Sequence, residues 1–289
     1  MPDLWELNTI TGASKSTVSK FLNGGLVKGN TAEAITQSAE FLIGQNRESL
    51  QADPVLTELE SRPESETTAF ITKGQKVCRA VLSFTEQDKE FSLITGPSGI
   101  GKSEIAKMYA KENDGVLMVE MKEAMTYGDI LTMLLEVMGQ SPSGSNYKKF
   151  CKLTDAAPAY RMLIVDEADL FCKGTVNSFL KKISIFRQIY ESGLGVCLIG
   201  LNILEERLRE SGETYIYSRF GYQRKLGGIS PDELAAFWKQ LGGKESDNLV
   251  EILRMSASRA WLRTLEKIYL RSKRVGVMSA TALIFGGGR

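Results

Sequence analysis

The stretch FSLITGPSGIGKSEIAKMY, residues 91–109, decides the fold. Its first five residues form an apolar run typical of a short buried strand, and apolar residues recur at helical spacing from Ile105 onwards. Between these runs, residues 96–103 fit the pattern G-x-x-x-x-G-K-[ST] in the strand-to-helix context of a phosphate-binding loop. Such a loop directs backbone N–H groups at phosphate oxygens, at a helix N-terminus that favours anions. The sequence therefore predicts a nucleoside triphosphate site.

Two residues of this loop carry side-chain chemistry. We expect Lys102 to contact the β- and γ-phosphates and the Ser103 hydroxyl to bind Mg²⁺. The other contacts are expected from the backbone of the loop and of the first helical residues. The predicted nucleotide-binding residues here are Gly96, Pro97, Ser98, Gly99, Ile100, Gly101, Lys102, Ser103 and Glu104.

Composition restricts the setting of this site. The chain has 289 residues, 43% of them hydrophobic, which is enough for one sizeable core and a small accessory domain. It contains no histidine and no C-x-x-C pair, which argues against a zinc site and against histidine-based acid–base chemistry. We see no membrane span or secretory signal, and so expect a cytoplasmic protein with reduced thiols and no membrane partner. The net charge of +1 does not indicate the overall basic surface that is typical of nucleic-acid-binding proteins.

Four blocks follow one another along the chain. Residues 1–44 carry short helical periodicities, and residues 45–67 are polar, acidic and interrupted by prolines, as in a linker. In residues 68–225 apolar runs alternate with helical segments, which predicts an α/β fold with a parallel sheet between helices. Residues 226–289 begin with a helix start at Ser230 and continue in helical segments, so we expect a small helical lid.

A second motif, RMLIVDEADLF at residues 161–171, places two adjacent acids at the end of a predicted buried strand. Open α/β sheets bind ligands at the carboxyl ends of their strands. In P-loop enzymes an acid at this position holds Mg²⁺, and the next one can polarise the attacking water. We therefore assign the metal to Asp166 and the role of general base to Glu167. Kinases of the adenylate or sugar type would not need adjacent acids there.

Three more residues fit an ATPase that responds to hydrolysis and to its neighbours. Asn202 follows a predicted strand at residues 195–200 and could orient the attacking water. Arg219 could reach the γ-phosphate of a neighbouring subunit, which accelerates hydrolysis by roughly 10³–10⁵-fold in other ATPases and GTPases. Arg263, on a predicted lid helix, could contact the γ-phosphate of its own subunit. The ordinary alternatives are a turn asparagine and two surface arginines.

The N-terminal block has the pattern of a helix-turn-helix. LWELNTITGASKSTVSKFLNGG, residues 4–25, places apolar residues on one face of two short helices, with Gly12 in the turn between them. The outward-facing residues suit contacts to DNA, although a three-helix protein-interaction module would show the same pattern. The predicted DNA contacts in this block are Lys15, Ser16, Thr17 and Lys20.

The order of the motifs resembles the AAA+ ATPases, and with the N-terminal pattern it resembles the transposition regulators of the Mu B and TnsC type. The stretches GASKSTVSKFLN, GPSGIGKSEIAKMY, MLIVDEADLF, VCLIGLN and RAWLRTLEKIY carry this resemblance. It implies that Asn202 is sensor 1, Arg219 the arginine finger and Arg263 sensor 2. It also implies that Phe70, Ile71 and Thr72 begin the segment that flanks the adenine. It also implies ATP and Mg²⁺ as cofactors.

The resemblance further implies a filament that assembles on duplex DNA with ATP and marks it as a target for a partner transposase. A filament repeats a few basic contacts per subunit, so near-neutral net charge is compatible with largely nonspecific DNA binding. Two other functions remain open, a helicase loader of the IstB or DnaC kind and an ATP-sensing transcription regulator. The candidate DNA contacts in the core are Lys122, Thr126, Tyr127, Lys148, Lys149 and Lys152.

Overall fold

The computed structural model describes residues 71–212, 214–243, 252, 256 and 261–275. The chain divides into two compact units, Met1–Ser65 and Glu66–Arg289, and the described residues all belong to the second. The predicted helix-turn-helix, with its four candidate DNA contacts, and Phe70 lie outside the described residues, and the predicted limits of the four blocks stay predictions.

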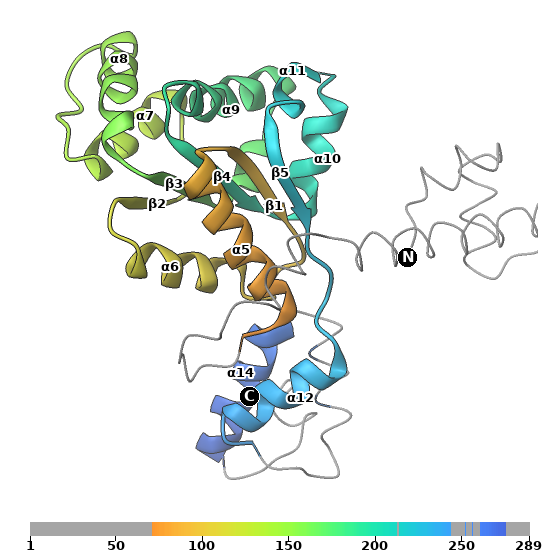
Figure 1. The fold of residues 1–289 in the computed structure, drawn as a ribbon. Coiled ribbons are helices and arrows are strands. Elements are labelled where there is room, and N and C mark those ends of the chain that lie inside the picture. The colour runs from red at the N-terminus through yellow and green to blue at the C-terminus, as the bar shows by residue number, and fades with distance from the viewer. Residues whose placement is uncertain (1–70, 213, 244–251, 253–255, 257–260, 276–289) are drawn as a thin grey trace, which may run out of the picture. The chain divides into compact units, whose positions relative to one another are not determined.

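A parallel sheet forms the centre of the described unit (Figure 1). Its strand order is β2-β3-β4-β1-β5. The register pairs Thr95 with Gly200 and Glu120 with Asp166, so the carboxyl ends of neighbouring strands meet at one edge. This confirms the predicted α/β fold. The strands are β1 (Phe91–Thr95), β2 (Val116–Glu120), β3 (Met162–Asp166), β4 (Gly195–Gly200) and β5 (Phe220–Lys225).

The sequence pattern does not predict β5. This strand has the sequence FGYQRK, and Phe220 alone of its residues is buried. It lies at the edge of the sheet and pairs with β1 on one side. An edge strand that is partly exposed needs no continuous apolar run, which is why periodicity does not reveal it.

Helices cover both faces of the sheet, with α5 and α6 on one face and α7 to α10 on the other (Figure 1). Successive strand residues point to opposite faces, so Val196 and Leu198 enter one apolar core while Cys197 and Ile199 enter the other. The helices are α5 (Lys73–Asp88), α6 (Lys102–Glu112), α7 (Tyr127–Val137), α8 (Asn146–Ala156), α9 (Val176–Glu191), α10 (Asn202–Glu210) and α11 (Thr214–Tyr217), with 3-10 helices η1 (Ala157–Ala159) and η2 (Ala168–Cys172).

Two further helices, α12 (Pro231–Gln240) and α14 (Trp261–Val275), follow β5 and pack on the α5 and α6 side. The predicted start of α12 is confirmed, because the Ser230 hydroxyl accepts the Glu233 N–H and the Glu233 carboxylate accepts the Ser230 N–H. Glu233 Oε1 also accepts the Lys73 N–H at 2.7 Å, which joins α12 to the start of α5. Within the described ranges, no helix combines the length and the apolar character needed to cross a membrane.

Candidate nucleotide-binding site

The phosphate-binding loop lies between β1 and α6. Gly99 and Gly101 have φ angles of 81° and 92°, the left-handed region that favours glycine. A Cβ on Gly101 would lie 2.3 Å from Gln75 Nε2, so a side chain at this position would also collide with α5. The two glycines thus allow the turn that leads from the end of β1 into the N-terminus of α6.

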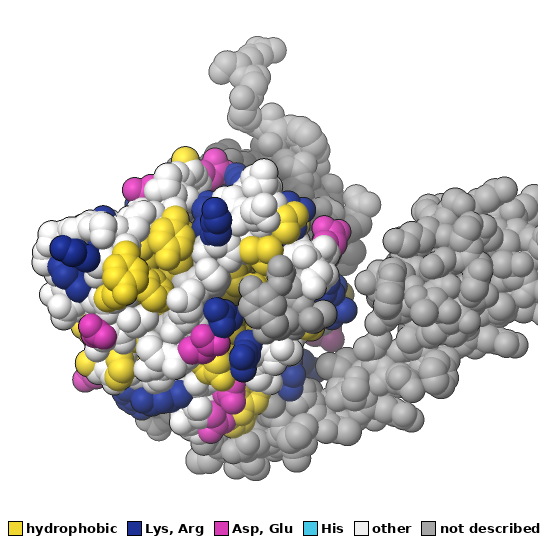
Figure 2. Space-filling view, turned by 90° about the horizontal axis from the view of Figure 1, so that it is seen from above, with side chains coloured by type: hydrophobic (Ala, Val, Ile, Leu, Met, Phe, Trp, Pro, Cys, Tyr) yellow, Lys and Arg dark blue, Asp and Glu magenta, His cyan; other side chains and the backbone are white. Residues whose placement is uncertain are grey.

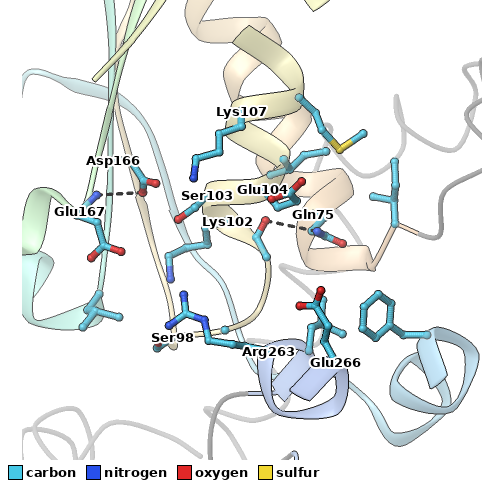
Figure 3. Close-up of a pocket in the computed structure, with 18 of the residues that line it drawn as sticks. Gln75, Ser98, Lys102, Ser103, Glu104, Lys107, Asp166, Glu167, Arg263 and Glu266 are labelled. Carbon is cyan, nitrogen blue, oxygen red and sulfur yellow. Dashed lines mark hydrogen bonds between the residues drawn. The ribbon is translucent and has the colours of Figure 1, made fainter. Parts of the chain in front are cut away.

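A cavity of about 680 Å³ opens beside this loop. Its walls come from the loop, from the ends of β3 and β4, and from α5, α6, α12 and α14, and Figure 3 shows many of its side chains converging. Its size and mixed lining are typical of small-molecule sites. The predicted site residues that line it are Ser98, Gly99, Gly101, Lys102, Ser103, Glu104, Asp166, Glu167 and Arg263.

Lys102 is a buried cation at the base of this cavity. Its Nζ donates to the carbonyl oxygens of Gly96 and Pro97, each at 2.8 Å. Burial lowers the pKa of this ammonium, whereas the negative charges of Asp166 and Asp169 act to raise it. The loop carbonyls hold the ammonium in place, next to the backbone N–H groups that would bind phosphate.

The two adjacent acids lie at the end of β3. Asp166 is 3% exposed, and its Oδ1 accepts the Glu167 N–H at 3.0 Å. Glu167 has a φ of 55°, and Figure 3 shows both carboxylates facing the side of the cavity where Lys102 and Ser103 lie. Burial raises the pKa of Glu167, and the negative charges of Asp166 and nearby acids raise it further. A carboxylate with a raised pKa is a better general base near neutral pH.

Ser103 and Asp166 supply the kind of ligands that Mg²⁺ prefers. This ion is usually held by one or two protein oxygens together with phosphate oxygens and water. In the part of the chain that the structure describes, no group of three or more His, Cys, Asp or Glu side chains could hold a metal alone. The donor set therefore fits a metal that binds together with the nucleotide.

Arg263 and Glu266 enter the cavity from α14. The Leu262 N–H donates to the Gly99 carbonyl at 3.1 Å, which fixes the start of α14 against the phosphate loop. Figure 3 shows the Arg263 side chain extending towards Lys102 and Ser98. α14 thus supplies a cation on the side of the cavity where Lys102 and Ser98 lie.

The segment predicted to flank the adenine leads into α5. The Thr72 hydroxyl accepts the Gln75 N–H and the Gln75 amide oxygen accepts the Thr72 N–H, a reciprocal cap at the start of α5. Thr72 is 2% exposed and does not line the cavity, whereas Ile71 and Gln75 do. Thr72 therefore supports this wall of the cavity through Gln75. Apolar residues of the same cavity are Ile71, Ile105, Met108, Phe237, Leu241 and Leu262.

Asn202 and Arg219 lie outside this cavity. Asn202 begins α10 directly after Leu201, which lines the cavity, and the Asn202 Oδ1 is buried and accepts no hydrogen bond from the described residues. Arg219 precedes Phe220, which pairs with Phe91 at the start of β1, whereas the phosphate loop follows the end of β1. About 13 Å of strand separate the two edges, so Arg219 does not reach the phosphate loop of its own subunit.

A second cavity, of about 590 Å³, lies between the loops that follow β2 and β3. We call it the basic groove. Of its lysines, Lys173 pairs with Glu123, and it is the only one that pairs with a carboxylate among the described residues. Thr126 and Thr175, the N-caps of α7 and α9, also line it. The lysines that define the groove are Lys122, Lys173, Lys181 and Lys182.

The three candidate lysines of α8 do not line the basic groove. Lys149 Nζ donates to the Thr132 hydroxyl at 2.8 Å, and Lys152 Nζ donates to the carbonyls of Ser141 and Ser143 at 3.1 Å each. On the face that Figure 2 shows, the described Lys and Arg side chains form separate groups between hydrophobic and uncharged ones. Lys122, Thr126 and Tyr127 are therefore the predicted core contacts that share one groove.

Comparison with known proteins identifies the fold. Residues 85–208 match the family model described as AAA domain. A comparison with curated proteins gave no match. The ORC1 protein of Aeropyrum pernix, in a structure in complex with DNA, is 13% identical with a TM-score of 0.56, over 71% of this chain and 61% of that chain.

Two other solved structures are similar at the same level. The ORC2 protein of Aeropyrum pernix in its ADP form is 16% identical with a TM-score of 0.52, over 76% of this chain and 68% of that chain. A Walker-type ATPase of Pyrococcus abyssi is 15% identical with a TM-score of 0.54, over 76% of this chain and 72% of that chain. At these identities the likeness concerns the fold.

Proposed function

We propose that this protein, whose residues 85–208 match the AAA domain model, hydrolyses ATP to control its assembly on duplex DNA. In this proposal the assembled filament selects a transposition target and recruits or activates a transposase. The observation that carries the ATPase part is the convergence of the phosphate loop, Asp166, Glu167 and Arg263 on one cavity. The transposition part rests on the resemblance of the motifs to the Mu B and TnsC type.

Each residue of the cavity has a task in hydrolysis. Lys102 and the backbone N–H groups of the loop neutralise the phosphates, and Ser103 and Asp166 would hold Mg²⁺. When bound there, the metal would supply positive charge against the charge that develops on the phosphate oxygens. Glu167 accepts a proton from the attacking water, and Arg263 contacts the γ-phosphate from the lid.

Replacing the proposed base tests the hydrolytic part. We expect Glu167→Gln to bind ATP normally and to hydrolyse it about 10²–10⁴-fold more slowly, because the amide keeps the shape but cannot accept a proton. Single-turnover phosphate release and ATP affinity measure the two properties separately. Glu136→Gln, an exposed substitution on α7, is the matched control and should retain the wild-type rate. Wild-type hydrolysis by Glu167→Gln would mean that another group is the base.

The basic groove supports contact with the DNA backbone. Lysine side chains and helix N-termini are common phosphate ligands, and contacts of this kind do not depend on sequence. The ORC1 neighbour was solved in complex with DNA, which fits a DNA-binding role for a chain of this fold. η2 contributes Asp169 to the nucleotide cavity and Leu170 and Phe171 to the groove, so one short segment borders both. Nucleotide and DNA could then influence each other through η2.

Neutralising the groove tests this contact. We expect the triple variant Lys122→Ala, Lys181→Ala and Lys182→Ala to bind random duplex DNA more weakly at every sequence. Each lost phosphate contact should also flatten the slope of log affinity against log salt by about 0.9. The measurement is a salt titration of ATP-dependent binding to one random duplex.

A second triple variant compares the α8 lysines. Lys148→Ala, Lys149→Ala and Lys152→Ala should change the slope less, because Lys149 and Lys152 already donate hydrogen bonds within the protein. A larger effect of this second variant on the slope would indicate that the DNA contacts α8 and not the basic groove. Unchanged slopes in both, with binding lost on replacing Lys15 and Lys20, would favour an operator-binding regulator instead.

A further inference from the structure

Asp169 is a buried acid to which the proposed hydrolysis assigns no role. It is 8% exposed and lines the nucleotide cavity two residues after Glu167, in the first turn of η2. A carboxylate is seldom buried without a specific partner, because removing it from water is costly. Its partner therefore indicates what it is for.

That partner is the backbone at the end of β4. Asp169 Oδ1 accepts the Leu201 N–H at 3.0 Å. Leu201 is the N-cap of α10, and its own side chain makes no capping hydrogen bond. Asp169 thus anchors, from another segment of the chain, the residue from which α10 begins.

Gly200 brings the two segments into direct contact. A Cβ at this position would lie 2.9 Å from both the backbone N and the Oδ1 of Asp169. Gly200 does not have a positive φ, so what favours glycine here is space and not backbone conformation. η2 consequently packs on bare backbone at the end of β4.

Asn202 is the next residue after the anchored Leu201. Its Oδ1 is buried and accepts no hydrogen bond from the described residues, although a buried amide oxygen normally has a donor. Asn202 is the first residue of α10, so its place depends on where that helix begins. The helix begins where Asp169 holds Leu201.

We propose that Asp169 is a positioning residue, which through the Leu201 N–H holds Asn202 at a fixed place relative to Glu167. Glu167 and Asp169 belong to the same turn, so this contact relates the proposed base to Asn202, which directly follows the cavity residue Leu201 and for which the sequence predicts the role of orienting the attacking water. This inference rests on the proposed hydrolysis, and it adds to that proposal a residue that acts through the backbone of Leu201. A displacement of about 1 Å at a reacting group can cost on the order of a hundredfold in rate.

The test is a double-mutant cycle on the full chain. We expect Asp169→Ala to lower kcat by about a hundredfold with little change in ATP affinity, because the loop and Lys102 are untouched. Asp169→Asn keeps an acceptor oxygen and should restore most of the rate. Gly200→Ala should reproduce the loss of rate, since its Cβ would push η2 away. The exposed substitution Asp155→Ala on α8 is the control.

The decisive measurement combines Asp169→Ala with Asn202→Ala. If Asp169 acts through Asn202, the double variant should be no slower than Asn202→Ala alone. If the rate of the double variant falls by the product of the two single losses, the inference is overturned, whereas the proposed ATPase function is unaffected. A wild-type rate for Asn202→Ala would also overturn it, whereas failure of the proposed function itself would appear as no hydrolysis in the wild type. If Asp169→Ala does not fold, the same cycle is run with Gly200→Ala.

Discussion

Lys102→Ala is expected to abolish measurable ATP binding, and with it any ATP-dependent assembly on DNA. The Lys102 ammonium lies within the field of Asp166, Glu167 and Asp169, three acids at the same cavity. Without this ammonium the three carboxylates would face a polyphosphate of the same sign, and like charges at short range oppose binding strongly. The Gly96 and Pro97 carbonyls would also lose the donor that they share.

Equilibrium binding of ATP and of ADP measures this effect, and thermal unfolding shows that the variant is folded. Lys107→Ala is the matched control, because Lys107 lines the same cavity from α6 but is exposed and lies 3.9 Å from Glu120. We expect the control to weaken binding only slightly, since exposed charges are screened. ATP affinity close to that of the wild type in folded Lys102→Ala would refute the assignment of the phosphate-binding loop.

The fold was predictable where local pattern and tertiary environment agree. The strands β1, β3 and β4 are buried in every residue, so each appears in the sequence as a mainly apolar run. The cap at Ser230 is a contact between residues three apart, which sequence also reveals. The sequence pattern does not predict β5, because β5 is an edge strand and its pairing with β1 depends on the assembled sheet.

The candidate site divides in the same way. The phosphate loop and Asp166-Glu167 are contiguous motifs, so sequence assigns them without knowledge of the packing. Gln75 and Glu266 enter the cavity from helices distant in sequence, and no local pattern marks them. The position of Asp169 shortly after Asp166-Glu167 in the sequence could have marked it as a candidate site residue. Its hydrogen bond to Leu201 spans 32 residues and depends on β3 and β4 being neighbours, so sequence does not reveal it.

The basic groove was unpredictable for the same reason. Lys122 follows β2, whereas Lys173 follows η2 and Lys181 and Lys182 lie on α9, so α7, α8 and β3 separate Lys122 from the other three in sequence. Counting basic residues along the chain favours α8, where three lysines lie close together in sequence. Two of those side chains are held by hydrogen bonds of their own, a property that only the folded structure reveals.

The largest effect on rate is expected at Arg219. This residue lies at the amino edge of β1, opposite the phosphate loop, and its side chain is 53% exposed. Its Nε lies 3.9 Å from Glu191, a loose surface pair that contributes little to stability, so Arg219→Ala should fold normally. We expect the variant to bind ATP with unchanged affinity and to lose roughly 10³–10⁵-fold in assembly-dependent hydrolysis, because its finger no longer completes the neighbour's site.

Arg219→Lys keeps the charge but loses the planar guanidinium, so it should recover only part of the rate. Mixing distinguishes action on a neighbour from a structural effect within one subunit. Arg219→Ala retains the phosphate loop and Glu167, whereas Glu167→Gln retains ATP binding and Arg219. In a random one-to-one mixture about a quarter of head-to-tail interfaces would join an intact site to an intact arginine, so hydrolysis should return although neither variant alone is active. Co-assembled mixtures that stay inactive would show that Arg219 does not act on the neighbouring subunit.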